Sequence, residues 1–204
     1  MRITQKYSHL NGEEYLIVHQ NDLYNEIKEV IDGLDADTFR TKISKEKMKM
    51  GNVLLAPIAL HKAFEVAFNI KGWKGSRYSY YITLDRELMG QTVNMTDKVQ
   101  KKFLIDKGDP TPINTYNQID FVKNKIAVEV QFGRNSLVAY DLFVKHMLFY
   151  TGGKINLGIE ILPTKAMQAQ MSKRVAYFEE EVYNVMRHGR NSPPVPLLIL
   201  GVEP

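Results

Sequence analysis

Residues 117–132, which decide the fold of this chain, read Asn117-Gln-Ile-Asp-Phe-Val-Lys-Asn-Lys-Ile-Ala-Val-Glu-Val-Gln-Phe132. Two runs, one near 117–122 that is half apolar and one near 126–132 that is mostly apolar, flank the polar triplet Lys123-Asn124-Lys125. Apolar runs joined by a short polar turn are typical of paired antiparallel strands. We therefore expect a β-hairpin here, and we expect the rest of the sheet to form around it.

The hairpin carries two carboxylates, Asp120 and Glu129, and the amide of Gln131. Glu129 lies inside an apolar run, where an unpaired buried charge is costly, and Gln131 shares its strand face. A divalent cation bound by both carboxylates would remove that cost, and oxygen ligands suit Mg²⁺. Such an ion polarises a phosphoryl group and activates water, so the pattern favours phosphodiester hydrolysis. The plainer alternative is an ordinary surface hairpin.

Other side chains limit the chemistry further. Gln131 cannot be a general base, because an amide takes up no proton near neutral pH, but it can orient water or donate to a phosphate oxygen. The five histidines form no HExxH motif, so a histidine-based zinc site is not expected. His61 and His146 are expected as packed or surface residues of helices.

Length and composition indicate an ordinary globular protein. The chain has 204 residues, of which 44% are hydrophobic and 25% charged, so we expect one domain over residues 1–204. The net charge of +4 is compatible with a polyanionic partner. There is no cysteine, which excludes disulfides and thiolate metal sites. With no apolar N-terminal segment and no membrane-length run, we expect a soluble protein of the cytoplasm.

Hydrophobic periodicity predicts alternating strands and helices along the second half of the chain. This alternation favours an α/β fold with a mixed central β-sheet flanked by helices. Around Asn11-Gly12 the pattern fits either a hairpin or a strand that enters a helix. We expect helices over 21–34, 57–70, 94–107, 136–150 and 175–187, and strands over 77–84, 154–162 and 195–202.

The chain resembles the PD-(D/E)xK nucleases and, within them, the type II restriction endonucleases of the BstYI and BglII group. The resemblance covers nearly the whole chain and is closest to the BstYI type. The segments that carry it are Tyr7-Ser-His-Leu-Asn-Gly12, Arg40-Thr-Lys42, Ser44-Lys-Glu-Lys47, Lys71-Gly-Trp73, Tyr116-Asn-Gln118, Asp120-Phe-Val-Lys123, Glu129-Val-Gln-Phe-Gly133, Val138-Ala-Tyr-Asp-Leu-Phe-Val-Lys-His-Met147, Glu160-Ile-Leu-Pro163 and Tyr183-Asn-Val185.

The resemblance implies a restriction-endonuclease-like core and a homodimer that cuts double-stranded DNA with Mg²⁺. It implies a palindromic site with a GATC core, RGATCY in the BstYI type, cut before GATC to leave 5′ overhangs. A cognate DNA methyltransferase that protects the host sites, in a prokaryotic cytoplasm, would accompany such an enzyme.

The resemblance also assigns roles to individual residues. Asp120, Glu129 and Gln131 fall on the catalytic positions, and the carbonyl of Val130 is a further metal ligand. Gln131 stands where the wider superfamily has lysine, which puts a lysine-assisted mechanism in doubt. Some relatives add an acid from an upstream helix, for which Glu65 is the local candidate, although a solvated helix face is the favoured interpretation.

Two loops are candidates for reading bases. Arg134, Asn135 and Ser136 follow the catalytic strand, and Arg134 can bond guanine in the major groove. Asn135 or Ser136 can instead simply cap the next helix. The second loop contains Ser172, Lys173 and Arg174, and the resemblance places base contacts there. Because the loops differ from the BstYI type at three of these positions, the flanking-base preference stays open.

A basic run and an apolar helix complete the set of candidates. The run over 40–49 is either a solvated face or an arm that contacts phosphates, which would position the DNA without reading its sequence. Helix 136–150 is apolar on nearly every side, so it is either fully buried or packed between the sheet and a second subunit. The basic residues expected at phosphates are Lys123, Arg40, Lys42, Lys45 and Lys47.

Two other functions remain open at this point. One is a sequence-specific DNA-binding protein whose nuclease site is inactive, which would bind without cutting. The other is a structure-specific repair nuclease, which would cut branched or damaged DNA without regard to GATC.

Overall fold

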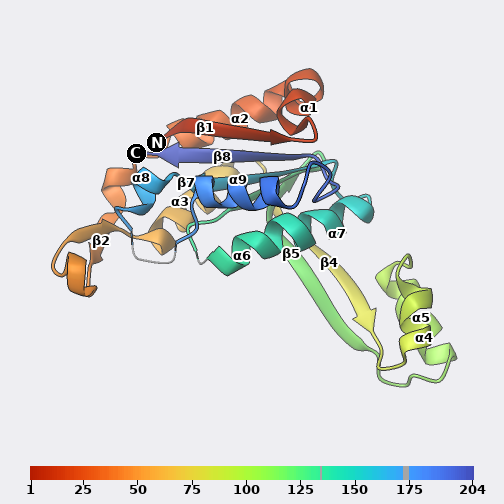
Figure 1. Ribbon diagram of the computed structural model, residues 1–204. Coiled ribbons are helices and arrows are strands. Elements are labelled where there is room, and N and C mark those ends of the chain that lie inside the picture. Colours follow the sequence, from red (N-terminus) through yellow and green to blue (C-terminus); the bar gives the residue numbers. More distant parts are fainter. Residues whose placement is uncertain (134, 172–174) are drawn as a thin grey trace. The chain divides into compact units, whose positions relative to one another are not determined.

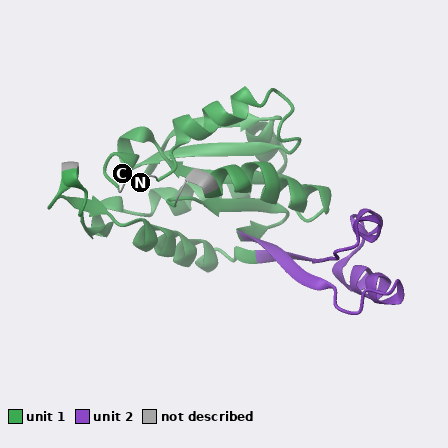
Figure 2. Cartoon of the chain, turned by 60° about the horizontal axis from the view of Figure 1, so that its bottom comes forward, with its two compact units in different colours: residues 1–75, 120–204 green, residues 76–119 purple. Residues whose placement is uncertain are grey.

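The computed structural model describes residues 1–133, 135–171 and 175–204, and their side chains except those of Met48, Asn135 and Ser136. The chain divides into two compact units, one of residues 1–75 and 120–204 and one of residues 76–119 (Figure 2). The expectation of one domain over the whole chain stays a prediction.

The described strands form a six-stranded mixed sheet in the order β1-β8-β7-β6-β5-β4 (Figure 1). The pairs β6–β7 and β7–β8 are parallel, whereas β1–β8 and β5–β6 are antiparallel. The predicted α/β class with a mixed sheet is therefore confirmed. The strands are β1 (Arg2–His9), β4 (Lys74–Ile82), β5 (Ile113–Lys123), β6 (Ile126–Val130), β7 (Leu157–Pro163) and β8 (Leu197–Glu203), and a separate pair joins β2 (Arg40–Ile43) to β3 (Val53–Leu55).

The helices follow the predicted periodicity closely. The segment after Asn11 is a helix, so the first of the two patterns weighed there, a hairpin, is excluded. Two short helices, α4 and α8, were not expected, and each begins at a side-chain cap, Asp85 and Thr164 respectively. The helices are α1 (Gly12–His19), α2 (Asn21–Asp32), α3 (Pro57–Ile70), α4 (Arg86–Thr92), α5 (Asp97–Asp106), α6 (Asn135–Tyr140), the π-helical turn η3 (Asp141–Lys145), α7 (His146–Thr151), α8 (Lys165–Gln168) and α9 (Phe178–Arg187), with 3-10 turns η1 (Ala36–Phe39) and η2 (Lys47–Lys49).

Both faces of the sheet in the larger unit are covered, because alternate residues of each strand join different cores. Along β8, Leu198 and Leu200 belong to a core with α2 and α3, whereas Leu197 and Ile199 belong to a second core with α6, η3 and α9. Along β6, Val128 faces the first core. Glu129 therefore points to the opposite face, where the helix of α6, η3 and α7 lies.

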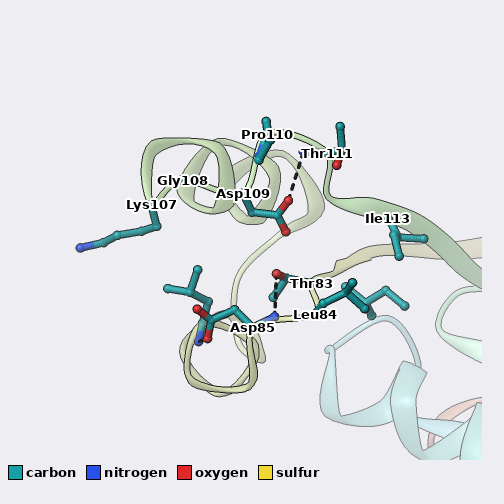
Figure 3. A pocket seen from close by; sticks show the side chains of 11 residues that line it. Thr83, Leu84, Asp85, Lys107, Gly108, Asp109, Pro110, Thr111 and Ile113 are labelled. Atoms are coloured by element: carbon teal, nitrogen blue, oxygen red, sulfur yellow. Dashed lines mark hydrogen bonds between the residues drawn. The ribbon is translucent and has the colours of Figure 1, made fainter.

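The smaller unit, residues 76–119, contains α4 and α5. A pocket of about 370 Å³ lies within it, between the segment that ends β4 and the loop before β5 (Figure 3). The main-chain NH of Asp85 donates to the Thr83 hydroxyl, and that of Thr111 to the Asp109 carboxylate. Within the described residues of both units, no helix is long and apolar enough to cross a membrane.

Candidate active site

The predicted hairpin forms, and it brings the two carboxylates together. Phe121 of β5 pairs with Val128 of β6 in the antiparallel register. Asp120 and Glu129 are the next residues along the two strands, so they lie opposite each other. The turn residues Asn124 and Lys125 both have positive φ, of 46° and 64°, as two-residue hairpin turns require.

Glu129 is fully buried, at 0% exposure, under the helix of α6, η3 and α7. Its Oε1 accepts a hydrogen bond from Lys145 Nζ at 2.6 Å, and Lys145 itself is only 13% exposed. The other oxygen, Oε2, is buried and has no hydrogen-bond partner among the described residues. One oxygen of Glu129 is thus fixed, and the other remains to be bound.

Asp120 is partly exposed and bonded to α3. Its Oδ2 lies 3.2 Å from His61 Nε2 and 3.4 Å from the main-chain nitrogen of Val130. Burial alone would raise the pKa of Asp120, but the hydrogen bond and charge of His61 lower it below its ordinary value. The same contact raises the pKa of His61. Asp120 is therefore ionised at neutral pH.

Gln131, directly after β6, connects this strand to the covering helix. Its Nε2 donates to Asp141 Oδ2 at 2.6 Å, and Asp141 Oδ1 lies 2.7 Å from Lys145 Nζ. Gln131 also lines a pocket of about 250 Å³ with His61 and Gly133. The carboxylates themselves do not line this pocket, but His61, which contacts Asp120, does.

A second buried acid lies beside Glu129. Glu160 of β7 pairs with Glu129 in the parallel register, and its Oε1 is hydrogen-bonded to His146 Nε2 at 3.0 Å. A Cβ atom on Gly158 would overlap the His146 ring, so glycine is required for this close packing of α7 on β7. His146 is packed, as expected, whereas His61 contacts the candidate site.

Crowding of carboxylates governs the electrostatics of the cluster. Burial and the charge of Asp120 raise the pKa of Glu129 well above its ordinary value, although Lys145 opposes the shift. Burial also raises the pKa of Asp141 to about 6 against the effect of Lys145. Burial would lower the pKa of Lys145, but Glu129 and Asp141 outweigh it and raise the pKa. The cluster thus holds more carboxylates than its cations balance, which favours an added cation.

His146 and Glu160 form a second contact, which is fully buried. Burial, with the nearby Lys145, lowers the pKa of His146 to about 3, and burial raises the pKa of Glu160. His146 is therefore neutral near pH 7, so its contact with Glu160 is a hydrogen bond and not an ion pair.

The residues present fit a divalent ion such as Mg²⁺. In the described parts of the chain, no three His, Asp or Glu side chains form a metal-binding group by themselves. The expected ligand set is different: two carboxylates, of Asp120 and Glu129, and the carbonyl of Val130. The buried, partnerless Oε2 of Glu129 beside an ionised Asp120 is the chemistry that a hard cation would satisfy.

The candidate base-reading residues lie largely outside the described structure. Arg134 and residues 172–174, which include Ser172, Lys173 and Arg174, are outside the described residues. Asn135 and Ser136 form the first turn of α6, and their side chains are not among those described. Their roles stay predictions.

The basic residues fall into two groups. Lys123 is bound to protein, since its Nζ lies 2.8 and 2.7 Å from the Glu26 carboxylate oxygens and 2.9 Å from the Lys71 carbonyl. Arg40 bonds Asp37 at 2.6 Å and also Gln170. Lys42, Lys45 and Lys47, on the β2–β3 segment, are exposed to solvent, and Lys42 also interacts within the protein.

Three residues near the carboxylates were not assigned from the sequence: His61, Asp141 and Lys145. The sequence does contain one signal, because Asp141 and Lys145 are charges four residues apart on an otherwise apolar helix. Glu65, the upstream candidate, instead pairs with Lys62 at 2.8 Å, and its side chain is 41% exposed.

Comparison with known proteins shows that the fold of this chain is that of a restriction endonuclease. The chain is similar to the restriction endonuclease BglII complexed with a DNA 16-mer (TM-score 0.66, 19% identity, 100% of this chain and 79% of that chain). It is also similar to free BglII (TM-score 0.58, 16% identity, 100% and 80% of the two chains). The family "Restriction endonuclease BglII/BglIII" matches residues 4–202, so the chain belongs to that family. No curated protein sequence matches it significantly.

Proposed function

We propose that this protein is a Mg²⁺-dependent type II restriction endonuclease that cuts double-stranded DNA at a palindrome with a GATC core. Its family supports a site-specific DNA nuclease. The observation that carries the proposal is the buried, partnerless Oε2 of Glu129 beside Asp120 on the neighbouring strand. The finer assignment, RGATCY cut before GATC to leave 5′ overhangs, rests on the resemblance in sequence to the BstYI type.

The chain's own groups have distinct parts in this reaction. Asp120, Glu129 and the Val130 carbonyl would hold Mg²⁺, which when bound polarises the phosphoryl group and lowers the pKa of its water. His61 keeps Asp120 in place and ionised. Gln131, at the pocket wall, orients the attacking water.

Sequence-specific binding is proposed for the loops at 133–136 and 171–174, with Arg134 as the main base contact. The exposed lysines of the β2–β3 segment, among them Lys47, would contact phosphates. Arg134→Ala should therefore relax or destroy site choice, whereas Lys47→Ala should weaken binding to all sequences alike. Equal effects of both variants on every sequence would contradict this division.

A homodimer is proposed because a palindromic site calls for two-fold symmetry. One face of the helix of α6, η3 and α7 packs on the sheet, and its outer face exposes apolar side chains. Leu137, Tyr140, Val144 and Met147 recur at helical spacing with 38–51% exposure. A second copy of the same helix is the partner that such a self-complementary face fits.

The dimer is tested by sedimentation. Val144→Asp should shift the protein toward monomer, because it places a charge in the middle of the apolar face. Val18→Asp, at an exposed apolar residue of α1, is the control and should leave the dimer intact. A dimer unaffected by Val144→Asp would place the interface elsewhere.

Cleavage is tested on unmethylated plasmid DNA that carries GATC-centred sites. With Mg²⁺ we expect discrete fragments with 5′-GATC ends. In the prokaryotic cytoplasm, a cognate methyltransferase would protect the host's own sites from this cleavage. Asp120→Asn should lower the rate at least about a thousandfold, since a metal ligand is worth several kcal/mol, while DNA binding survives. Asp32→Asn, at an exposed acid of α2, is the control. Specific binding by the wild type without cutting would support the inactive-site alternative.

A further inference from the structure

The π-helical turn η3 brings two charged groups into the site from the covering helix. The main-chain NH of His146 donates to the Asp141 carbonyl five residues earlier, as a π-helical turn requires. Asp141 and Lys145 are both turned toward the sheet, at 3% and 13% side-chain exposure. Apart from His146, the rest of the buried face of this helix is apolar, with Val138 and Leu142 in the core.

These two groups complete a closed chain of contacts around the catalytic strand. Glu129 Oε1 bonds Lys145, Lys145 bonds Asp141, and Asp141 accepts from Gln131 Nε2. Gln131 is two residues from Glu129, so the backbone of the strand closes the ring.

Within the described residues, one oxygen of Glu129 and one of Gln131 lie outside this ring of contacts. Lys145 holds Oε1 of Glu129, so Oε2 is the atom left for a ligand. Asp141 holds the nitrogen of Gln131, so its carbonyl oxygen is the group that remains. That oxygen points toward Gly133, where a Cβ atom would meet it at 3.6 Å, and Gly133 lines the same pocket.

Stability alone does not account for this arrangement. A buried ion pair is worth little compared with apolar residues of similar volume, because both charges must be removed from water. A pair of charges on a buried face whose other residues are apolar or, like His146, uncharged is therefore better explained by what it positions.

We propose that Lys145 and Asp141 are positioning residues of the cleavage reaction. Lys145 fixes Glu129 so that Oε2 is presented beside Asp120, and Asp141 fixes the amide of Gln131 so that its carbonyl oxygen accepts from the attacking water. The helix thereby supplies the ammonium group that the catalytic strand lacks. This inference rests on the proposed nuclease function.

The test separates cleavage from binding. Single-turnover cleavage is measured at saturating Mg²⁺ and DNA, and DNA affinity is measured without metal. Lys145→Met should lower the rate about a hundredfold, as loss of a preorganised charge does, with DNA affinity changed less than about threefold. Lys145→Arg should retain at least about a tenth of the rate, because its guanidinium can bond both carboxylates. Lys71→Met, at a surface ion pair with Glu29, is the control and should cut normally.

A double-mutant cycle tests the second half of the proposal. If Asp141 acts through Gln131, Asp141→Asn, which keeps an oxygen for Lys145, should cost less rate in the Gln131→Ala background than in the wild type. Fully additive losses would overturn that link.

Several outcomes would overturn the role of Lys145. Cleavage by folded Lys145→Met within about threefold of the wild type, or a loss of melting temperature with an unchanged rate per folded molecule, would show a merely structural role. If Lys145→Met does not fold, Lys145→Gln keeps a neutral donor and is judged by the same limits. A wild type that does not cut at all refutes the proposed function, whereas variants that cut as well as an active wild type refute this inference alone.

Discussion

Glu181 allows the cost of a buried carboxylate in this fold to be measured directly. It lies on α9 with 1% of the residue exposed, and Asn184 Nδ2 donates to its Oε2 at 3.2 Å. Burial raises the pKa of Glu181 from 4.5 to about 7, and the hydrogen bond from Asn184 only partly opposes the shift. The folded protein therefore binds this proton more tightly than the unfolded chain does.

The sign and size of the effect follow from that difference. The stability contributed by protonated Glu181 is fully present below pH 4.5 and is lost as the pH rises through about 7. The rise from 4.5 to about 7 corresponds to about 3 kcal/mol of unfolding free energy, at about 1.4 kcal/mol for each pH unit.

The variant Glu181→Gln removes this titration. Its unfolding free energy relative to the wild type should rise by about 3 kcal/mol between about pH 4 and about pH 8, with most of the change in the window between the two pKa values. Urea unfolding followed by circular dichroism, at fixed protein concentration, measures it. The comparison across pH cancels the constant cost of burying the new amide.

Glu180→Gln is the matched control. Both residues lie in the first turn of α9, so both variants lose the same favourable interaction with the helix dipole. Glu180 is less buried than Glu181, so Glu180→Gln shows how much of the change comes from losing a charge in this turn. The reasoning fails if the two variants have the same pH dependence, or if Glu181→Gln has none.

Three further predictions concern packing and DNA binding. Gly12→Ala should lower the unfolding free energy, measured by urea unfolding, by about 1–3 kcal/mol, because its Cβ would overlap the carbonyl of Leu197. In the same assay Gly90→Ala in α4, whose Cβ meets nothing within 4 Å, should raise the unfolding free energy by about 0.5–1 kcal/mol. Trp73→Phe should cost about 1–3 kcal/mol in the same assay, since it removes a partly buried 3.0 Å hydrogen bond to Glu26; no loss would show that this bond contributes nothing. DNA affinity should fall linearly on a log–log plot against salt, and a flat plot would exclude phosphate contacts as the main source of binding.

The helices and strands were largely predictable because their signals are local. Helix α3 spans Pro57–Ile70, the range that its proline and apolar spacing predict. The first strand enters a helix after Asn11, where the sequence allowed two outcomes. Helix α8 was missed because four residues show no period, and its start depends on a cap by Thr164.

The pairing of Asp120 with Glu129 was determined by the sequence itself. The two residues lie on one hairpin, whose tight turn fixes the register without help from the rest of the chain. The apolar neighbours of Glu129 already predicted its burial, and with it the need for a cation.

The remainder of the site was decided only by tertiary structure. His61, Asp141 and Lys145 reach the hairpin from α3 and η3, and nothing in their local sequence specifies which face of the sheet those helices cover. That choice depends on the strand order β1-β8-β7-β6-β5-β4 and on the two cores that it creates. The sequence by itself therefore determined the carboxylate pair, because its register is local, whereas long-range packing alone determined the groups that hold the pair in position.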